Sequence, residues 1–151
     1  MDSNTPAEQT VSAYFIVKDA ASALDFYARA FGAEEVFRLT DPSGRIGHAQ
    51  IRLGDSLMML ADEHPDFGAV SALTFGGSPV RFHLSVSDAN ASTQRAVEAG
   101  ATLIRPVQDQ FYGLRSGMVA DPFGYEWFIG QPVEQVSPEE MQHRFTQALE
   151  G

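Results

Sequence analysis

The chain contains the same residue pattern twice. Residues 17–19, Val-Lys-Asp, open a helical stretch that ends at the Gly-Ala pair of residues 32–33. Residues 86–88, Val-Ser-Asp, open a second stretch that ends at the Gly-Ala pair of residues 100–101. The two Asp residues are 69 positions apart (88 minus 19) and the two Gly 68 apart (100 minus 32). This spacing indicates a duplicated supersecondary unit, whose ligand site is expected where the two copies face each other.

Composition limits the kind of protein this can be. With 151 residues, 44% of them hydrophobic, the chain can form one compact domain or two fused half-domains. The absence of Cys excludes disulfides, thiolate metal sites and a Cys nucleophile, and it fits a reducing compartment, so we expect a cytoplasmic protein. A net charge of −10 argues against nucleic acid or an anionic membrane as a partner. Residues 1–6 have neither a basic cluster nor an apolar run, so no secretory signal is expected there.

The first copy predicts a β-α-β-β-β order. Residues 11–17 are apolar and β-prone, which predicts a strand. Asp19 suits a helix N-cap, an apolar stripe that includes Leu24 and Tyr27 follows it, and Gly32 suits the helix end. Three more strands are expected, over residues 34–40, 46–53 and 57–61.

The second copy repeats this order. We expect a strand over residues 80–86, a helix over 88–99 and strands near 101–105, 115–120 and 125–129. A Gly- and Pro-rich stretch connects the copies and could cover a pocket. A capping box at residues 137–140 opens a last helix, which should pack on the body or on a second subunit. The chain therefore divides into a first module (11–62), a connector (63–79), a second module (80–130) and a C-terminal helix (137–150).

Several short motifs carry a family resemblance. They are Asp25-Phe26-Tyr27 before Phe31-Gly32-Ala33, Gly54-Asp55 before Leu57-Met58-Met59-Leu60, and Asp121-Pro122-Phe123-Gly124-Tyr125. Over roughly residues 11 to 130 the chain resembles the vicinal oxygen chelate superfamily, the glyoxalase, bleomycin-resistance and extradiol-dioxygenase group. The resemblance implies an α+β fold in which two tandem β-α-β-β-β modules form a curved mixed sheet around a pocket, with the C-terminal helix added.

The resemblance also bears on metal chemistry. The positions that supply metal ligands in the metal-using members fall on Ser12, Met59, Arg81 and Phe128. None is a usual ligand for a divalent metal held by imidazole and carboxylate, and Arg81 would put a positive charge where the cation sits. We therefore expect no metal and no cofactor. The chain looks like the metal-free bleomycin-resistance-like branch, which implies sequestration of a small molecule and a homodimer.

Polar residues alternate with apolar ones along the strand over residues 46–53. Because Ala, Ile and Leu take the side under the helix, His48 and Gln50 should face the concave side. The same alternation puts Tyr14, Met59 and His83 on that side.

Three roles are open for the two histidines. His48 and His83 could be hydrogen-bonded lining residues, could transfer protons, or could form a displaced metal site with Glu126.

The loop over residues 109–115 is the second segment in which residues suited to ligand binding lie close together. Phe111 and Tyr112 could stack on a flat ligand, and Arg115 could contact its charge. Trp127 alternates with Phe128, so one of the two should face the pocket and the other the helix. The alternative is that these aromatic residues complete a core and the module interface.

We see no nucleophile elbow, P-loop, dinucleotide fingerprint or H-E-x-x-H helix, so the sequence leans against an enzyme without deciding the point. The leading hypothesis is metal-independent binding of a small aromatic or planar organic molecule. The alternatives are a divalent-metal-dependent lyase, isomerase or dioxygenase with a displaced metal site, and an interaction module whose cavity its own side chains fill. The expected ligand contacts are Tyr14, His48, Gln50, Met59, Arg81, Phe111, Tyr112, Arg115 and Trp127.

Overall fold

The first module folds in the expected order. A computed structural model describes residues 9–151, so the expectation about a secretory signal at residues 1–6 lies outside the described residues. The elements are β1 (Tyr14–Val17), α1 (Ala20–Phe31), β2 (Glu34–Thr40), β3 (Ile46–Leu53) and β4 (Ser56–Asp62). The strands form one sheet in the order β1-β4-β3-β2, in which β1 and β4 are parallel and the other pairs antiparallel.

The second module repeats this topology. Its elements are β5 (Phe82–Ser85), α3 (Ala89–Ala99), β6 (Thr102–Asp109), β7 (Leu114–Ala120) and β8 (Glu126–Pro132), with strand order β5-β8-β7-β6. The α+β fold of two β-α-β-β-β modules is therefore confirmed. Within residues 9–151 the strands pair only inside their own module, so there are two four-stranded sheets rather than one continuous sheet.

The two main helices begin in the same way. The side chain of Asp19 accepts a hydrogen bond from the backbone N–H of Ser22, and Asp88 accepts from the N–H of Ala91. Each carboxylate satisfies one of the N–H groups that a helix start leaves without a partner. Gly32 ends α1 at φ 72°, a left-handed conformation that glycine adopts without the steric cost of a Cβ.

A second cap also repeats in the two modules. The N–H of Ala20 donates to the Asp62 carboxylate at 2.6 Å, and the N–H of Ala89 donates to the Gln131 side-chain oxygen at 3.0 Å. Both acceptors lie at the end of the last strand of their module. This contact fixes each helix start to its own sheet.

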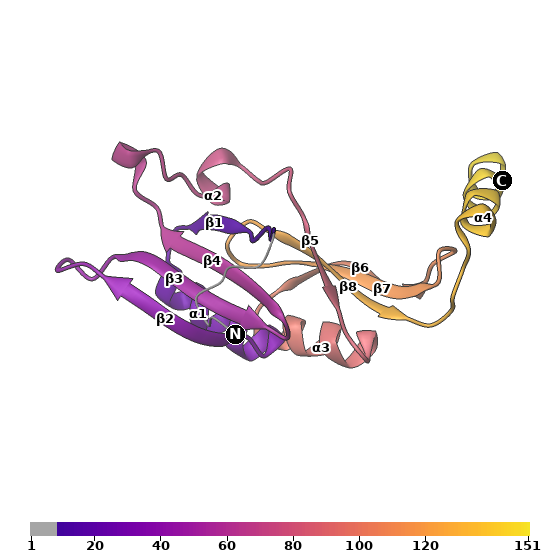
Figure 1. Cartoon of the computed structure of the whole chain (residues 1–151), viewed down its shortest axis with the longest axis horizontal. Helices are drawn as coiled ribbons and strands as arrows, with labels where there is room; N and C mark the ends of the chain where they lie inside the picture. Colours follow the sequence, from indigo (N-terminus) through magenta and orange to yellow (C-terminus); the bar gives the residue numbers. More distant parts are fainter. Residues whose placement is uncertain (1–8) are drawn as a thin grey trace.

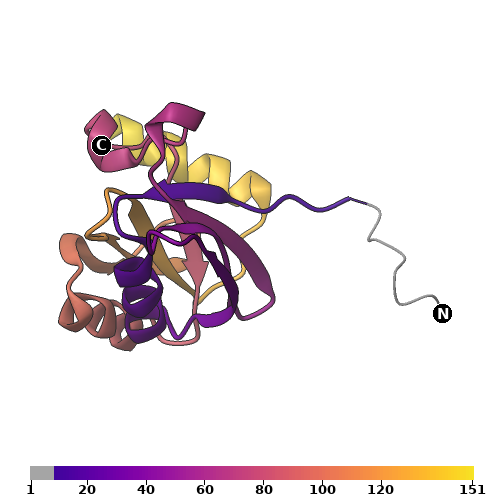
Figure 2. The ribbon, with the colours of Figure 1, turned by 90° about the vertical axis from the view of Figure 1, so that its left-hand side faces the viewer.

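The helices cover one side of the sheets and leave the other side open. Helices α1 and α3 lie side by side along the lower edge of the molecule in Figure 1, and Figure 2 shows the same pair from the end. Arg95 of α3 donates to the backbone oxygen of Arg29 at 2.7 Å, and Arg29 donates to that of Ala99 at 3.1 Å. We call the side of each sheet that faces away from these helices its open face.

An aromatic core joins the two modules on the helix side. Trp127 of β8 packs against Phe31 and Tyr27 of α1, with ring centroids 4.5 and 5.6 Å apart. Phe15 of β1 packs against Phe82 of β5 at 5.3 Å. These rings come from both modules, so neither module can complete its core alone.

A buried carboxylate lies within this core. Asp121 accepts hydrogen bonds from the Tyr27 hydroxyl at 2.6 Å, from the Trp127 indole N–H at 2.9 Å, and from the backbone N–H groups of Phe123 and Tyr125. Burial raises the pKa of Asp121 above its ordinary value, and these four hydrogen bonds oppose the rise. Burial also raises the pKa of Tyr27 well above its ordinary value, with the Asp121 charge as the next cause.

The outer strands β2 and β6 are irregular. Their pairing shifts between Glu35 and Phe37 in β2, and between Leu103 and Arg105 in β6. Both strands are exposed along nearly their whole length.

The connector contains two short helical segments that the sequence did not predict, η1 (Pro65–Phe67) and α2 (Ala72–Phe75). The Glu63 carboxylate accepts from the backbone N–H and the hydroxyl of Ser71, which caps α2. This contact ties the connector back to the end of β4.

The C-terminal helix α4 (Pro138–Glu150) forms where the capping box predicts it, with Ser137 accepting from the N–H of Glu140 at 3.1 Å. Figure 1 shows α4 set apart from the sheets, at the end of the molecule farthest from the first module. None of the helices in residues 9–151 is long and apolar enough to cross a membrane.

We predict that Asp121→Ala lowers the free energy of unfolding by about 3 kcal/mol, because it leaves several buried donors without an acceptor. Asp41 is the matched control. It opens an Asp-Pro-x-Gly turn of the same sequence pattern and also accepts from backbone N–H groups, but it is exposed. Asp41→Ala should cost about 1 kcal/mol in the same urea titration. Equal losses for the two variants would contradict the role given to Asp121.

Candidate functional site

Three of the predicted contact residues meet on the open face of the first sheet. The Tyr14 hydroxyl lies 3.1 Å from Nδ1 of His48, and Nε2 of the same ring lies 3.1 Å from the side-chain nitrogen of Gln50. The Tyr14 and His48 rings are 5.4 Å apart. We call these three residues the open-face triad.

Strand alternation explains how they come together. In β3, Ala49 and Ile51 are buried under α1, so the residues between them point the other way. Gln50 pairs with Met59 of β4 on one side and with Phe37 of β2 on the other, and residues directly opposite share a face. Met59 pairs in turn with Tyr14.

The surroundings of the triad are apolar and exposed. Phe37 lies beside the triad, with its ring 5.6 Å from that of His48. Tyr14 is 50% exposed and Phe37 is 40% exposed. The first open face therefore combines hydrogen-bonding groups with uncovered apolar surface.

The open face of the second sheet carries a different set. Arg81 forms an ion pair with Glu126 at 2.9 Å, and its guanidinium lies 5.9 Å from the centre of the Phe128 ring. His83 pairs with Phe128 across β5 and β8. A small cavity of about 190 Å³ also opens here, and Tyr112 is among the residues that line it.

Phe111 belongs to the surroundings of α4. Its ring lies 5.8 Å from that of Phe145, and its backbone oxygen accepts from Arg144 at 2.9 Å. Arg144 also pairs with Glu134 at 2.9 Å, so the β6–β7 hairpin and α4 hold each other in place.

Two predicted contacts do not lie on an open face. Trp127 pairs with Val119, and both point into the core, where the indole is 2% exposed. Trp127 also lines a groove of about 430 Å³ between the modules, together with Phe82 and His83. Phe128 takes the open-face position instead, because neighbouring strand residues point to opposite faces.

Arg115 is the second predicted contact that lies away from the open faces. It pairs with Gln131, which shares the face of Trp127, so its side chain points to the helix side. There it donates to Asp109 at 2.7 Å, and this hydrogen bond lowers the pKa of Asp109 below its ordinary value. The remaining predicted contacts thus fall on two surfaces of one chain: the first open face, and the second open face with its hairpin.

The donor set does not fit a divalent metal. Of the four family ligand positions, Ser12 and Met59 lie in the first module and Arg81 and Phe128 in the second, and none offers an imidazole or carboxylate. The displaced set of His48, His83 and Glu126 does not fit a metal either. Glu126 is paired with Arg81, and both ring nitrogens of His48 already face hydrogen-bond partners. Across residues 9–151, no three His, Asp or Glu side chains gather closely enough to hold a metal ion.

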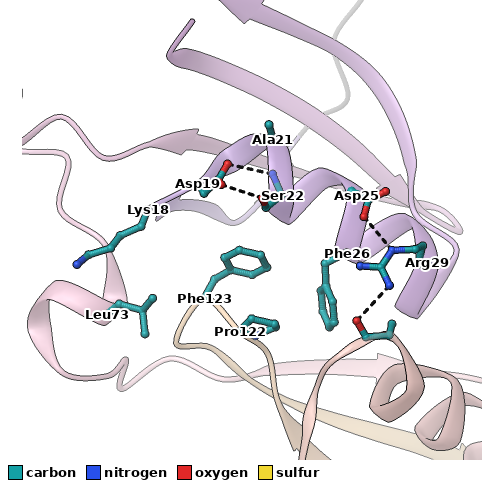
Figure 3. Close-up of a pocket in the computed structure, with 11 residues that line it drawn as sticks. Lys18, Asp19, Ala21, Ser22, Asp25, Phe26, Arg29, Leu73, Pro122 and Phe123 are labelled. Atoms are coloured by element: carbon teal, nitrogen blue, oxygen red, sulfur yellow. Dashed lines mark hydrogen bonds and ion pairs between the residues drawn. The ribbon is translucent and has the colours of Figure 1, made fainter.

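A groove that the sequence did not predict lies on the helix side, between α1, α2 and the turn before β8 (Figure 3). Its volume is about 720 Å³, and Phe26 and Phe123 form apolar parts of its wall. Asp25 pairs with Arg29, and Arg29 also holds α3, so these charged groups already serve the helix packing. The only signal for this groove was the turn at residues 121–124, which places Phe123 there. We regard it as a weaker candidate than the open faces.

The comparisons with known proteins agree with this architecture. The model of the Glyoxalase/Bleomycin resistance protein/Dioxygenase superfamily matches residues 9–129. The chain belongs to this superfamily. Its modules and the candidate site on their open faces all lie within the matched residues, apart from the end of β8.

Similar sequences come from a bacterium and a plant. An uncharacterized protein of Mycobacterium bovis is 42% identical over 147 residues, covering 95% of this chain and 97% of that protein. An uncharacterized protein of Arabidopsis thaliana is 28% identical over 126 residues, covering 78% of this chain and 74% of the relative.

Solved structures show the same fold. TioX from Micromonospora sp. ML1 superimposes with a TM-score of 0.64 at 25% identity, covering 83% of this chain and 99% of TioX. The fosfomycin resistance protein FosX from Mesorhizobium loti gives 0.61 at 16% identity, covering 91% and 99%. The superfamily scaffold does not by itself define a reaction.

We predict that Trp127→Ala and Phe128→Ala differ sharply in stability although the residues are neighbours. Trp127→Ala removes a buried ring that joins the modules and should lower the free energy of unfolding by about 3–5 kcal/mol. Phe128→Ala removes a ring from the open face and should cost less than half as much. Denaturant unfolding followed by circular dichroism measures both, and a larger loss for Phe128→Ala would contradict the assignment of faces.

Proposed function

We propose that this protein binds a small aromatic or planar organic molecule on its open faces, without the help of a metal. The observation that carries the proposal is the open-face triad, Tyr14, His48 and Gln50, beside the exposed Phe37 ring. Ligand sites combine apolar lining with a few placed polar groups, and this surface has that composition.

The second open face supplies complementary chemistry. Arg81 stands beside the Phe128 ring, and Tyr112 lines the neighbouring cavity. A guanidinium next to an aromatic ring suits a planar ligand that carries an acceptor group, because it can stack as well as donate.

The rival function is a metal-dependent lyase, isomerase or dioxygenase. It requires His48, His83 and Glu126 to act as ligands, whereas the hydrogen bonds of His48 and the ion pair of Glu126 favour other roles. A third possibility is a module that binds no ligand, and the exposed polar and aromatic groups of the first open face argue against it.

We further propose that two copies form a homodimer that covers the open faces. Helix α4 carries an apolar stripe of Met141, Phe145 and Leu149, and Leu149 is 72% exposed. Phe145 of this stripe contacts Phe111 of the β6–β7 hairpin, but within residues 9–151 α4 packs on neither sheet, and it lies at the opposite end of the molecule from the first module (Figure 1). In such a dimer, α4 of each copy would lie over the first module of its partner. A two-fold axis would make this contact self-complementary, as it is in most dimers.

Ligand binding should be detectable by thermal shift with a panel of planar aromatic acids, ketones and amines. A ligand at about 100 times its dissociation constant should stabilise the fold by about 2.7 kcal/mol. The same protein, incubated with zinc, nickel, manganese and ferrous iron and then desalted, should retain far less than one metal per chain.

The outcomes separate the three functions. Stoichiometric metal that is lost on His48→Ala or Glu126→Ala would establish the metal-dependent alternative. Stabilisation by no member of the panel would favour the module without a ligand.

The dimer is tested by Leu149→Glu, which places a charge in the apolar stripe and should shift the protein towards monomer in analytical ultracentrifugation. Gln147→Glu adds the same charge on the opposite side of α4 and should leave the association unchanged. A monomeric wild-type protein, or equal behaviour of the two variants, would contradict the proposed interface.

A further inference from the structure

The open-face triad has a defined hydrogen-bond direction. The nitrogen of the Gln50 side chain faces Nε2 of His48 at 3.1 Å. With the amide in this orientation its nitrogen donates and Nε2 of His48 accepts, which places the ring proton on Nδ1.

The proton on Nδ1 also fixes which group donates in the hydrogen bond between His48 and Tyr14. Nδ1 of His48 lies 3.1 Å from the Tyr14 hydroxyl oxygen, so the ring donates and the hydroxyl oxygen accepts. The hydroxyl proton of Tyr14 is therefore left to donate elsewhere. Within residues 9–151 the hydroxyl makes no hydrogen bond other than the one to His48, and Tyr14 is 50% exposed.

We propose that Tyr14 is the hydrogen-bond donor that selects the ligand, and that Gln50, acting through His48, is the positioning residue that keeps the hydroxyl proton directed outwards. The ligand would carry an acceptor oxygen conjugated to an aromatic ring. The oxygen would accept from Tyr14, while the ring would pack against Phe37 and Met59, which flank the triad on the same face. This inference rests on the proposed binding function and deepens it.

Apolar neighbours make the choice of donor matter. A ligand that presents a hydrogen-bond donor instead of an acceptor would place its proton against that of the Tyr14 hydroxyl. Both donors would then lack an acceptor beside apolar surface. A site discriminates strongly between two ligands when the wrong one leaves polar atoms without hydrogen bonds. Apolar contacts alone give weaker discrimination.

The hydrogen-bond direction can be tested without any ligand. In full-length protein labelled with ¹⁵N, long-range ¹H–¹⁵N spectra in mildly alkaline buffer should show Nε2 of His48 unprotonated and Nδ1 protonated. In Gln50→Glu the carboxylate accepts instead of donating, so Nε2 should become protonated. A protonated Nε2 in the wild type, or an unprotonated Nε2 in Gln50→Glu, would overturn the positioning role of Gln50.

The selection itself is tested with two probes of nearly equal shape, 2-acetylnaphthalene and 2-ethylnaphthalene, which differ by a ketone oxygen. The wild type should bind the ketone about tenfold more tightly in a fluorescence titration, the equivalent of one good hydrogen bond. In Tyr14→Phe, which keeps the exposed ring, this preference should vanish while the affinity for 2-ethylnaphthalene stays the same.

The results distinguish this inference from the binding function on which it rests. Binding of both probes with the same preference in wild type and Tyr14→Phe would overturn the donor role and leave the binding function standing. If the wild-type protein bound neither probe, both the donor role of Tyr14 and the proposed binding function would be contradicted.

Discussion

The carboxylate of Asp121 connects the two halves of the molecule more directly than any other polar group described here. It accepts from Tyr27 of the first module and from Trp127 of the second, and two backbone N–H groups of its own turn complete its hydrogen bonds. The rings of both donors belong to the aromatic core. A buried carboxylate is tolerable only when its acceptor capacity is filled, so the position of α1 on the second module is fixed by hydrogen-bond geometry as well as by packing.

Because the modules meet on the helix side, their opposite faces stay uncovered. The polar groups of those faces differ although the backbones repeat: the first carries Tyr14, His48 and Gln50, and the second carries the Arg81–Glu126 pair. The duplicated unit thus gives one scaffold with two chemically distinct surfaces. Membership of the superfamily accounts for the scaffold, and the surfaces account for the specificity that we propose.

Much of this could be predicted from local sequence. Helix caps and periodicity gave the order of elements, and strand alternation placed His48 and Gln50 on the open face. The same rule could not place Trp127, because two adjacent aromatic residues suit either face, nor Arg115, because the register of a hairpin is not encoded in one strand. Helix α2 was missed because it is four residues long and lies in a Gly- and Pro-rich connector. The separation of the two sheets depends on contacts between residues far apart in the chain, which no local pattern records.

The irregular outer strands have a consequence for how this protein associates. Strands of other molecules can pair with a sheet edge that has a regular row of free N–H and C=O groups. Each added strand exposes a new edge, so the aggregate can keep growing. Here β2 is interrupted by its pairing shift and carries the Arg38–Glu35 ion pair, while β6 contains Pro106, which has no N–H to donate. Neither edge offers a straight template. The edges of this acidic chain therefore disfavour edge-to-edge pairing, in keeping with the closed dimer through faces and helices that we propose.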